Sequence, residues 1–166
     1  MKLQCYGIDI GAREAEIFDG GNTAIIATTL PQVGRAVARL LSLPVHPPSG
    51  SASSPCLADY KNKFVYISSF SVSQNDMLAS IQRATHTGAA DWTVTHKQVD
   101  QWIQEGRDKL AKGDWWGLKN VMYGSTLKKG LGDQFHGKEL ANKKLGLEEE
   151  DLDEVVRRVV REMEAA

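Results

Sequence analysis

The N-terminal part of the chain alternates between apolar and polar side chains, a pattern typical of β-strands. Residues 6–10 predict a short strand, and residues 14–18 continue the alternation less clearly. The run Asp19–Asn22 contains two glycines and predicts a turn. Residues 23–28 then predict another extended segment.

Helical spacing replaces this alternation at about residue 30. Thr29 can cap a helix predicted over about residues 30–42, and Pro31 in the first turn costs little because its missing N–H would be unpaired there anyway. The expected apolar face consists of Val33, Ala36, Val37, Leu40 and Leu41, with Arg35 and Arg39 opposite. Residues 43–59 are rich in Pro, Ser and Gly, and we interpret them as a flexible insertion loop rather than a linker between two domains.

A strand, a turn and a capped helix are predicted together in residues 61–85. The β-branched and aromatic run Phe64–Ile67 indicates a strand buried on both faces, as in a parallel sheet. Three serines, Ser68, Ser69 and Ser71, favour an exit turn. Ser73 and Asp76 form a variant capping box for a helix that buries Met77, Leu78, Ile81 and Ala84, with Gly88 as a stop signal.

The C-terminal part is predicted to be mainly helical. Trp92–Thr95 indicates a short strand, and Thr95 with Gln98 resembles a capping box for a helix that ends at Gly113. Asp114 can cap the next helix, whose apolar side comprises Trp115, Trp116, Leu118, Val121, Met122 and Leu127. The last helix carries acidic residues 148–151 at its positive dipole end and an apolar stripe of Leu152, Val155, Val156, Val159, Val160 and Met163.

Composition sets limits on function. The 166 residues suffice for one domain over residues 1–166, and a hydrophobic content of 42% is ordinary for a globular protein. The formal net charge of -1 gives no electrostatic basis for nucleic-acid binding. No apolar run is long enough to cross a bilayer and no secretory signal is evident, so we expect a cytoplasmic protein. Cys5 and Cys56 are interpreted as reduced thiols, and the four histidines show no metal-ligand spacing.

The sequence contains no established catalytic motif. It has no Gly-rich strand-to-helix turn for a dinucleotide, no phosphate-binding loop and no nucleophile elbow, so we expect no cofactor-binding or metal-ligating residues and identify no catalytic residue. Ser68, Ser69 and Phe70 follow a predicted strand, where open α/β sheets bind ligands, although turn chemistry is the favoured explanation of the serines. Trp115 and Trp116 are the other candidates for a substrate pocket, the favoured alternative being that one packs inward and the other covers a neighbouring helix.

The ordered set of segments resembles one family. YGIDIGAREAEIFDGGNTAIIATTLPQVGRAVARLL, NKFVYISSFSVSQNDMLASIQRAT, EGRDKLAKGDWWG and LGLEEEDLDEVVRRVV are similar to NmrA-like and isoflavone-reductase-like proteins, particularly fungal ones. The resemblance implies an α/β fold: the C-terminal half of an atypical short-chain dehydrogenase of NAD(P)-binding Rossmann-like type, with few strands and a helical C-terminal part. It also implies that NADP(H), the Gly-rich turn and the catalytic Lys belong to an N-terminal half that this chain does not match.

Three functions are open at this point. The first is the substrate-side portion of an NADP-dependent oxidoreductase, inactive alone, whose family acts on small aromatic or secondary-metabolite-like substrates. The second is a non-catalytic interaction or regulatory module that forms homo-oligomers or other complexes through uncovered sheet or helix faces. The third is a small cofactor-independent isomerase or cyclase.

Overall fold

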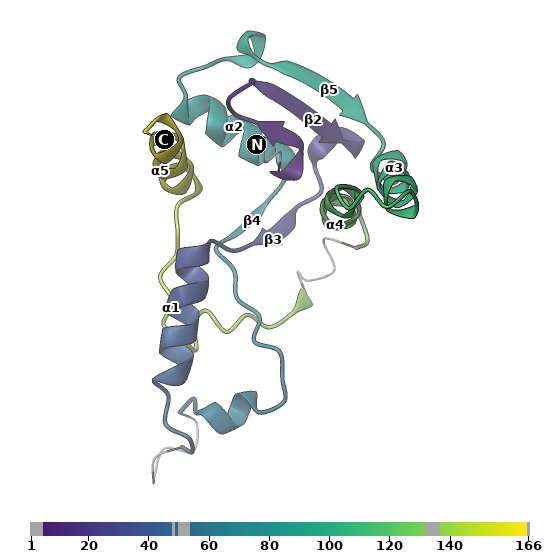
Figure 1. The fold of residues 1–166 in the computed structure, drawn as a ribbon. Coiled ribbons are helices and arrows are strands. Elements are labelled where there is room, and N and C mark those ends of the chain that lie inside the picture. The colour runs from purple at the N-terminus through teal and green to yellow at the C-terminus, as the bar shows by residue number, and fades with distance from the viewer. Residues whose placement is uncertain (1–4, 48, 50–53, 132–136, 166) are drawn as a thin grey trace. The chain divides into compact units, whose positions relative to one another are not determined.

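A computed structural model describes residues 5–47, 49, 54–131 and 137–165 (Figure 1). The chain divides into two compact units. Unit 1 comprises Met1–Ile26, Ser71–His136 and Asp151–Ala166, and unit 2 comprises Ala27–Phe70 and Gly137–Glu150. The single domain expected over residues 1–166 stays a prediction.

Short strands and longer helices alternate along the chain. The strands are β1 (Ile8–Asp9), β2 (Glu14–Phe18), β3 (Ile25–Ala27), β4 (Phe70–Val72) and β5 (Thr93–Lys97). The α-helices are α1 (Leu30–Leu41), α2 (Gln74–Ala84), α3 (Val99–Ala111), α4 (Gly117–Leu127) and α5 (Leu152–Glu164).

Unit 1 is built on a three-stranded sheet in the order β1-β2-β5. β1 runs antiparallel to β2, with Ile8 opposite Ala15, and β2 runs parallel to β5, with Ile17 opposite His96. The chain between the parallel strands includes α2, as in the crossovers of α/β proteins. β3 and β4 pair as a separate two-stranded sheet. The predicted α/β architecture with few strands and a helical C-terminal part is confirmed.

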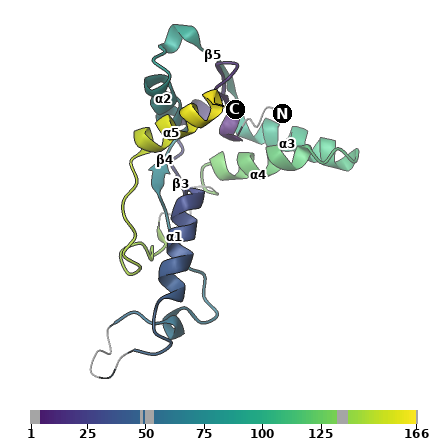
Figure 2. The same cartoon turned by 60° about the vertical axis from the view of Figure 1, so that its left-hand side comes forward.

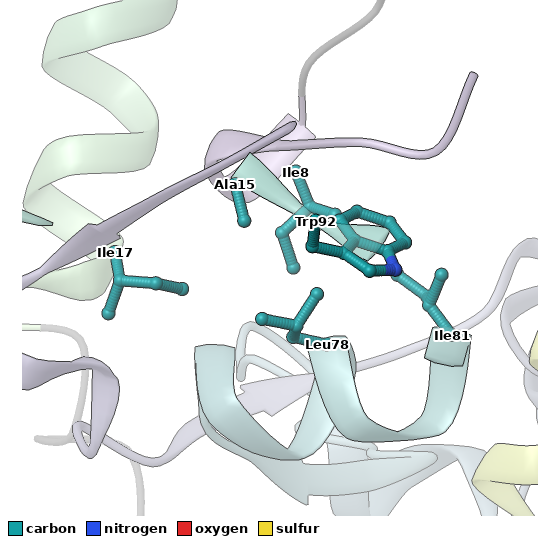
Figure 3. Packing of buried hydrophobic residues seen from close by; sticks show 6 residues of the cluster. All are labelled: Ile8, Ala15, Ile17, Leu78, Ile81 and Trp92. Carbon is teal, nitrogen blue, oxygen red and sulfur yellow. The ribbon is translucent and has the colours of Figure 1, made fainter. Parts of the chain in front are cut away.

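Helix α2 covers one face of the three-stranded sheet. Leu78 and Ile81 point from the helix toward Ile17 and Trp92, and all four side chains are buried (Figure 3). The predicted capping box is confirmed, because Ser73 Oγ accepts from Asp76 N at 3.2 Å and Asp76 Oδ2 accepts from Ser73 N at 2.9 Å. These hydrogen bonds hold the pKa of Asp76 below its usual range.

Helices α3 and α4 lie side by side in both views (Figures 1 and 2). Glycines allow the close approach: a Cβ added at Gly117 would lie 2.2 Å from the Gly106 carbonyl oxygen, and one at Gly124 would lie 2.6 Å from Ile103. The inner side of this pair meets the sheet through Trp102, whose ring stacks on Phe18 with 4.5 Å between centroids. The contact face of α4 therefore combines glycines with the buried Leu127 at the end of the helix.

The core of unit 2 is smaller. Ala36 of α1 packs with Ala141 and Leu145, and half-buried side chains surround them: Leu40, Leu43, Tyr60, Val65, Ile67 and Leu147. Cys56 is a buried free thiol of this unit. Among the described residues of 43–59, the 3₁₀ helix Leu57–Tyr60 is the regular element, while residues 48 and 50–53 of the expected loop lie outside the described residues.

The predicted strand at Phe64–Ile67 is wrong. These residues form no strand, Phe64 is 85% exposed, and the strand of this region is β4, which includes Ser71 of the expected turn. Isolated hydrogen bonds hold this backbone instead: Ala141 N donates to Tyr66 O at 2.7 Å, and Thr28 Oγ1 donates to Ile67 O at 3.1 Å. An apolar run predicts extended backbone, but a ladder needs a neighbouring strand along its whole length.

Several smaller predictions are also wrong. Helix α2 ends at Ala84, so Gly88 is not its stop. The capping box of Thr95 with Gln98 is absent, because Val99 N donates to Asp19 Oδ1 at 3.1 Å. The expected inner faces of three helices are partly exposed, as shown by Val33, Val37 and Leu41 in α1, Leu118 and Met122 in α4, and Val159 and Met163 in α5.

The glycine contact between α3 and α4 gives a stability prediction. Gly117→Ala forces a methyl group against the Gly106 backbone, and we expect it to lower the unfolding free energy by about 1–3 kcal/mol. Gly34→Ala in α1 is the matched control, because no atom lies within 4 Å of its added Cβ, and it should raise stability by about 0.5–1 kcal/mol. Urea denaturation measures both, and a Gly117→Ala variant as stable as the unmodified chain would contradict the packing.

Candidate functional site

The two sets of predicted site residues belong to different units. Ser68, Ser69 and Phe70 belong to unit 2, whereas Trp115 and Trp116 belong to unit 1. We therefore treat them as two candidate places.

Ser69 binds a carboxylate at the start of α1. Its hydroxyl donates to Glu150 Oε2, which also accepts from Thr29 Oγ1 at 2.7 Å. Arg35 Nη2 donates to Glu150 Oε1 at 2.7 Å. The Glu150 side chain is only 10% exposed, so three donors surround a carboxylate that has left most of its water.

The charge of Glu150 is stabilised by these neighbours. Burial alone would raise the pKa of the carboxyl group, but the hydrogen bonds from Ser69, Thr29 and Arg35 outweigh it and hold the pKa below its ordinary value. A carboxylate that stays ionised, and whose oxygens accept hydrogen bonds from donors of its own chain, is suited to a structural role rather than to proton transfer.

A buried glutamine extends this cluster. Gln32 is fully buried, its Nε2 donates to Glu148 O at 2.9 Å, and its Oε1 accepts from Arg35 Nε at 2.8 Å. Its backbone N–H donates to Thr29 Oγ1 at 3.1 Å, the cap that the sequence predicted. Residues 148–150 are thereby fixed to the first turns of α1.

Ser68 is held through its main chain. The Asn142 side chain accepts from Ser68 N at 3.0 Å and donates to Ser68 O at 2.7 Å, as a strand partner would. Phe70 begins β4 and is half-buried. The contacts of Ser68 and Ser69 fit the turn and cap chemistry that was the favoured explanation, and a substrate-binding role of these residues stays a prediction.

Both tryptophans of the second candidate place face solvent. Trp115 is 78% exposed and Trp116 65%, so neither packs inward and the favoured alternative is wrong. Their backbone forms the turn into α4, where Trp116 N donates to Asp114 Oδ1 at 3.0 Å. With Leu118 and Met122, they give unit 1 an exposed apolar patch on α4.

A pocket of about 490 Å³ lies in unit 2, away from the predicted residues. Its walls carry the rings of Tyr60, Phe64 and Tyr66 and the ammonium groups of Lys63 and Lys144. The Phe64 and Tyr66 ring centroids are 6.2 Å apart. The Tyr60 hydroxyl is buried and has no hydrogen-bond partner among the described residues.

The two pocket lysines differ in their pairing. Lys144 forms a 2.8 Å ion pair with Glu139, which raises the pKa of Lys144 and lowers that of Glu139. Lys63 makes no ion pair with any described residue. Asp59 and Glu139 also line the pocket, so a planar aromatic anion would have to bind by the rings and by Lys63, the ammonium group without an ion pair among the described residues.

A carboxylate lies at the N-terminus of every α-helix in the described part of the chain. Glu150 serves α1, Asp76 caps α2, Asp19 accepts from the first amide of α3, Asp114 precedes α4, and Asp151 accepts from Glu154 N at 2.8 Å in α5. A helix N-terminus attracts phosphate through its free amides and positive dipole end. A resident carboxylate uses that potential and repels a second anion.

The strand-to-helix connections have no glycine. In the described chain, β3 reaches α1 through Thr28 and Thr29, β4 reaches α2 through Ser73, and β5 reaches α3 through Gln98. A dinucleotide pyrophosphate needs glycine at such a turn so that the backbone can approach it closely.

Sequence reasoning missed the acidic residues that organise each unit. It assigned the carboxylates of residues 148–151 to the helix dipole, which holds for Asp151 but not for Glu150. Asp153 accepts from Ser80 Oγ at 2.6 Å and from both Nε and Nη2 of Arg83, and these bonds lower its pKa to about 2. The one sequence signal for Asp153 as their partner is that Ser80 and Arg83, three residues apart, lie on the same side of a predicted helix.

The described residues contain no cluster of His, Cys, Asp and Glu side chains that could hold a metal ion. No helix among them has both the length and the apolar composition needed to span a membrane.

The Glu150 cluster predicts how stability depends on pH. Because the folded-state pKa is lowered, its stabilisation is present above the ordinary glutamate value of 4.5 and is lost as pH falls through the folded pKa. We expect Glu150→Gln to cost about 1–3 kcal/mol at pH 7 and progressively less in acid. Urea unfolding across pH measures this, with exposed Glu149→Gln as the control. Equal losses for both variants at pH 7 would contradict the cluster's role.

Comparison with known proteins gives distant relatives. No family model matches the chain. It is 26% identical over 156 residues to "Oxidoreductase aprR" of Aspergillus flavus, covering 93% of this chain and 47% of that protein. It is 29% identical over 112 residues to "Oxidoreductase poxI" of Penicillium oxalicum, covering 68% of this chain and 31% of the relative. The chain thus spans about half the length, or less, of the curated relatives it matches.

One solved structure shares the fold. A nucleoside-diphosphate-sugar epimerase from Staphylococcus aureus superposes with a TM-score of 0.51 at 12% identity, over 89% of this chain and 44% of the epimerase. The α/β fold of this chain is therefore that of a part of a Rossmann-like protein.

Proposed function

We propose that this chain is the substrate-side portion of an NAD(P)-dependent oxidoreductase of the NmrA-like, isoflavone-reductase-like kind. The names of its fungal relatives and the shared fold with an epimerase support an oxidoreductase-type protein. The segments that carry the family resemblance support the finer assignment. A cytoplasmic location belongs to the same proposal.

The proposal further holds that the chain does not bind the dinucleotide alone. Its main support is the set of helix N-termini, each of which already holds a carboxylate of the chain itself. The three strand-to-helix connections without glycine give the same indication. The nucleotide site would then be supplied by a region corresponding to the part of the relatives that this chain does not span.

Calorimetry with NADPH tests the proposal. We expect no saturable heat when NADPH is titrated into the purified chain, and an NADPH-binding short-chain dehydrogenase serves as the positive control. The physical reason is that a pyrophosphate would meet carboxylates where it needs free amides. Saturable binding in the micromolar range would overturn this part of the proposal.

The unit 2 pocket supports a substrate class. A small aromatic, secondary-metabolite-like anion would place its ring against Phe64 and Tyr66 and its negative charge near Lys63. Tyr60 also lines the pocket, although its hydroxyl oxygen is buried.

Cinnamate is a simple probe of this pocket. Saturation-transfer NMR should detect binding, and Lys63→Glu should weaken it about fivefold, since an attraction of roughly 1 kcal/mol is lost. Lys61→Glu is the matched control, because Lys61 is exposed and does not line the pocket. Equal weakening by both variants, or no binding to the unmodified chain, would contradict the assignment.

A non-catalytic interaction module is the second candidate. The observation in its favour is the exposed patch of Trp115, Trp116, Leu118 and Met122 on α4. Aromatic side chains in such patches are common anchors of protein–protein contacts. The two candidates are compatible, since a substrate-side portion also needs surfaces on which other parts can pack.

A further inference from the structure

Helix α1 has one face that packs into its own unit and a second, apolar face that does not. Gln32 and Ala36 are buried and Leu40 is half-buried on the face that packs into unit 2. The second face is open to solvent, and its large side chains are Leu30 (85% exposed), Val33 (40%), Val37 (50%) and Leu41 (70%).

The open face is a continuous stripe without charge. The spacing of these four residues keeps them on one side of a helix. Gly34 and Ala38 lie between them, and we call the six residues the outer stripe: Leu30, Val33, Gly34, Val37, Ala38 and Leu41. The two arginines of α1 lie off the stripe: Arg35 binds Glu150, and Arg39 is on the opposite side of the helix.

The sizes along the stripe are self-complementary when two copies run antiparallel. With the two-fold axis at the middle of α1, Leu30 of one copy meets Leu41 of the other. In the same register Val33 meets Ala38, and Val37 meets Gly34. The space at Gly34 is empty, since no atom lies within 4 Å of an added Cβ, so it can receive a valine side chain.

From this pattern we propose that the outer stripe is the interface of a homodimer in which two α1 helices pack antiparallel about a two-fold axis. Each large residue then faces a small one or an equal leucine, which is how helices interdigitate at close approach. A two-fold contact of this kind uses the same patch on both copies. No like charges meet across it, because both arginines lie off the stripe.

The expected dimer is weak and depends on concentration. A helix of 12 residues is about 18 Å long, and one of its faces is much smaller than the roughly 800 Å² per partner of a standard stable interface. A flat lipid surface fits the stripe less well, because membrane-binding helices flank their apolar face with Lys and Arg. The second copy is therefore the occupant that the pattern favours.

Sedimentation velocity over a concentration series tests the dimer. The unmodified chain should shift from monomer toward dimer as its concentration rises, and Val37→Glu should abolish the shift because it places two charges at the centre of the contact. Val45→Glu is the matched control: Val45 is another exposed valine of unit 2, at 62%, and lies off the stripe. Circular dichroism should show that both variants are folded.

Disulfide trapping tests the orientation. Under oxidising conditions, Leu30→Cys mixed with Leu41→Cys should give a cross-linked pair, whereas neither variant alone should exceed the unmodified chain. Cross-linking of Leu41→Cys with itself would indicate parallel helices and overturn the proposal. A monomer at every concentration, or equal loss of dimer in Val37→Glu and Val45→Glu, would also overturn it, and would leave the stripe to a different polypeptide.

Discussion

Backbone amides and carbonyls that lose contact with water must find partners, and in this chain the strands are too short to supply them all. Side-chain amides from distant parts of the sequence take that role. Gln74 is buried, and its side chain donates to Tyr6 O and Glu16 O and accepts from Phe18 N, at 2.7, 2.9 and 2.9 Å. The side chain of Asn142 likewise accepts from the backbone N–H of Ser68 and donates to its carbonyl oxygen. The first fixes α2 to β2 in unit 1, and the second closes unit 2 around an irregular segment.

The same constraint explains why local patterns could be predicted better than pairings. The caps of α1 and α2 depend on residues three positions apart, so Thr29, Ser73 and Asp76 were identifiable from their own neighbourhood. Glu150 meets its donors across 81 to 121 residues of chain, and no spacing rule reaches that far. The strand expected at Phe64–Ile67 failed for the same reason, since a neighbouring strand is a property of the fold and not of the run itself.

Periodicity predicted the helices and the buried face of α2, but it did not predict the buried faces of α1 and α4. In α4, Leu118 and Met122 are exposed, whereas Leu127 is buried. In α1, a small residue, Ala36, and a polar one, Gln32, occupy the contact with unit 2. A hydrophobic stripe indicates that one side of a helix is suited to packing, but it does not identify whether the packing partner belongs to the same unit.

These outward faces connect the fold to the proposed function. A chain whose helix N-termini all held its own carboxylates and whose apolar stripes were all buried would offer neither an anion site nor an apolar surface to another molecule. This chain meets the first condition and not the second: its potential anion sites are closed, whereas Trp115, Trp116 and the outer stripe of α1 remain open. Exposed apolar area of this kind costs solubility unless another surface covers it. This contrast is the basis of two of our proposals, that the chain does not bind the dinucleotide alone and that its open apolar faces pack on protein surfaces.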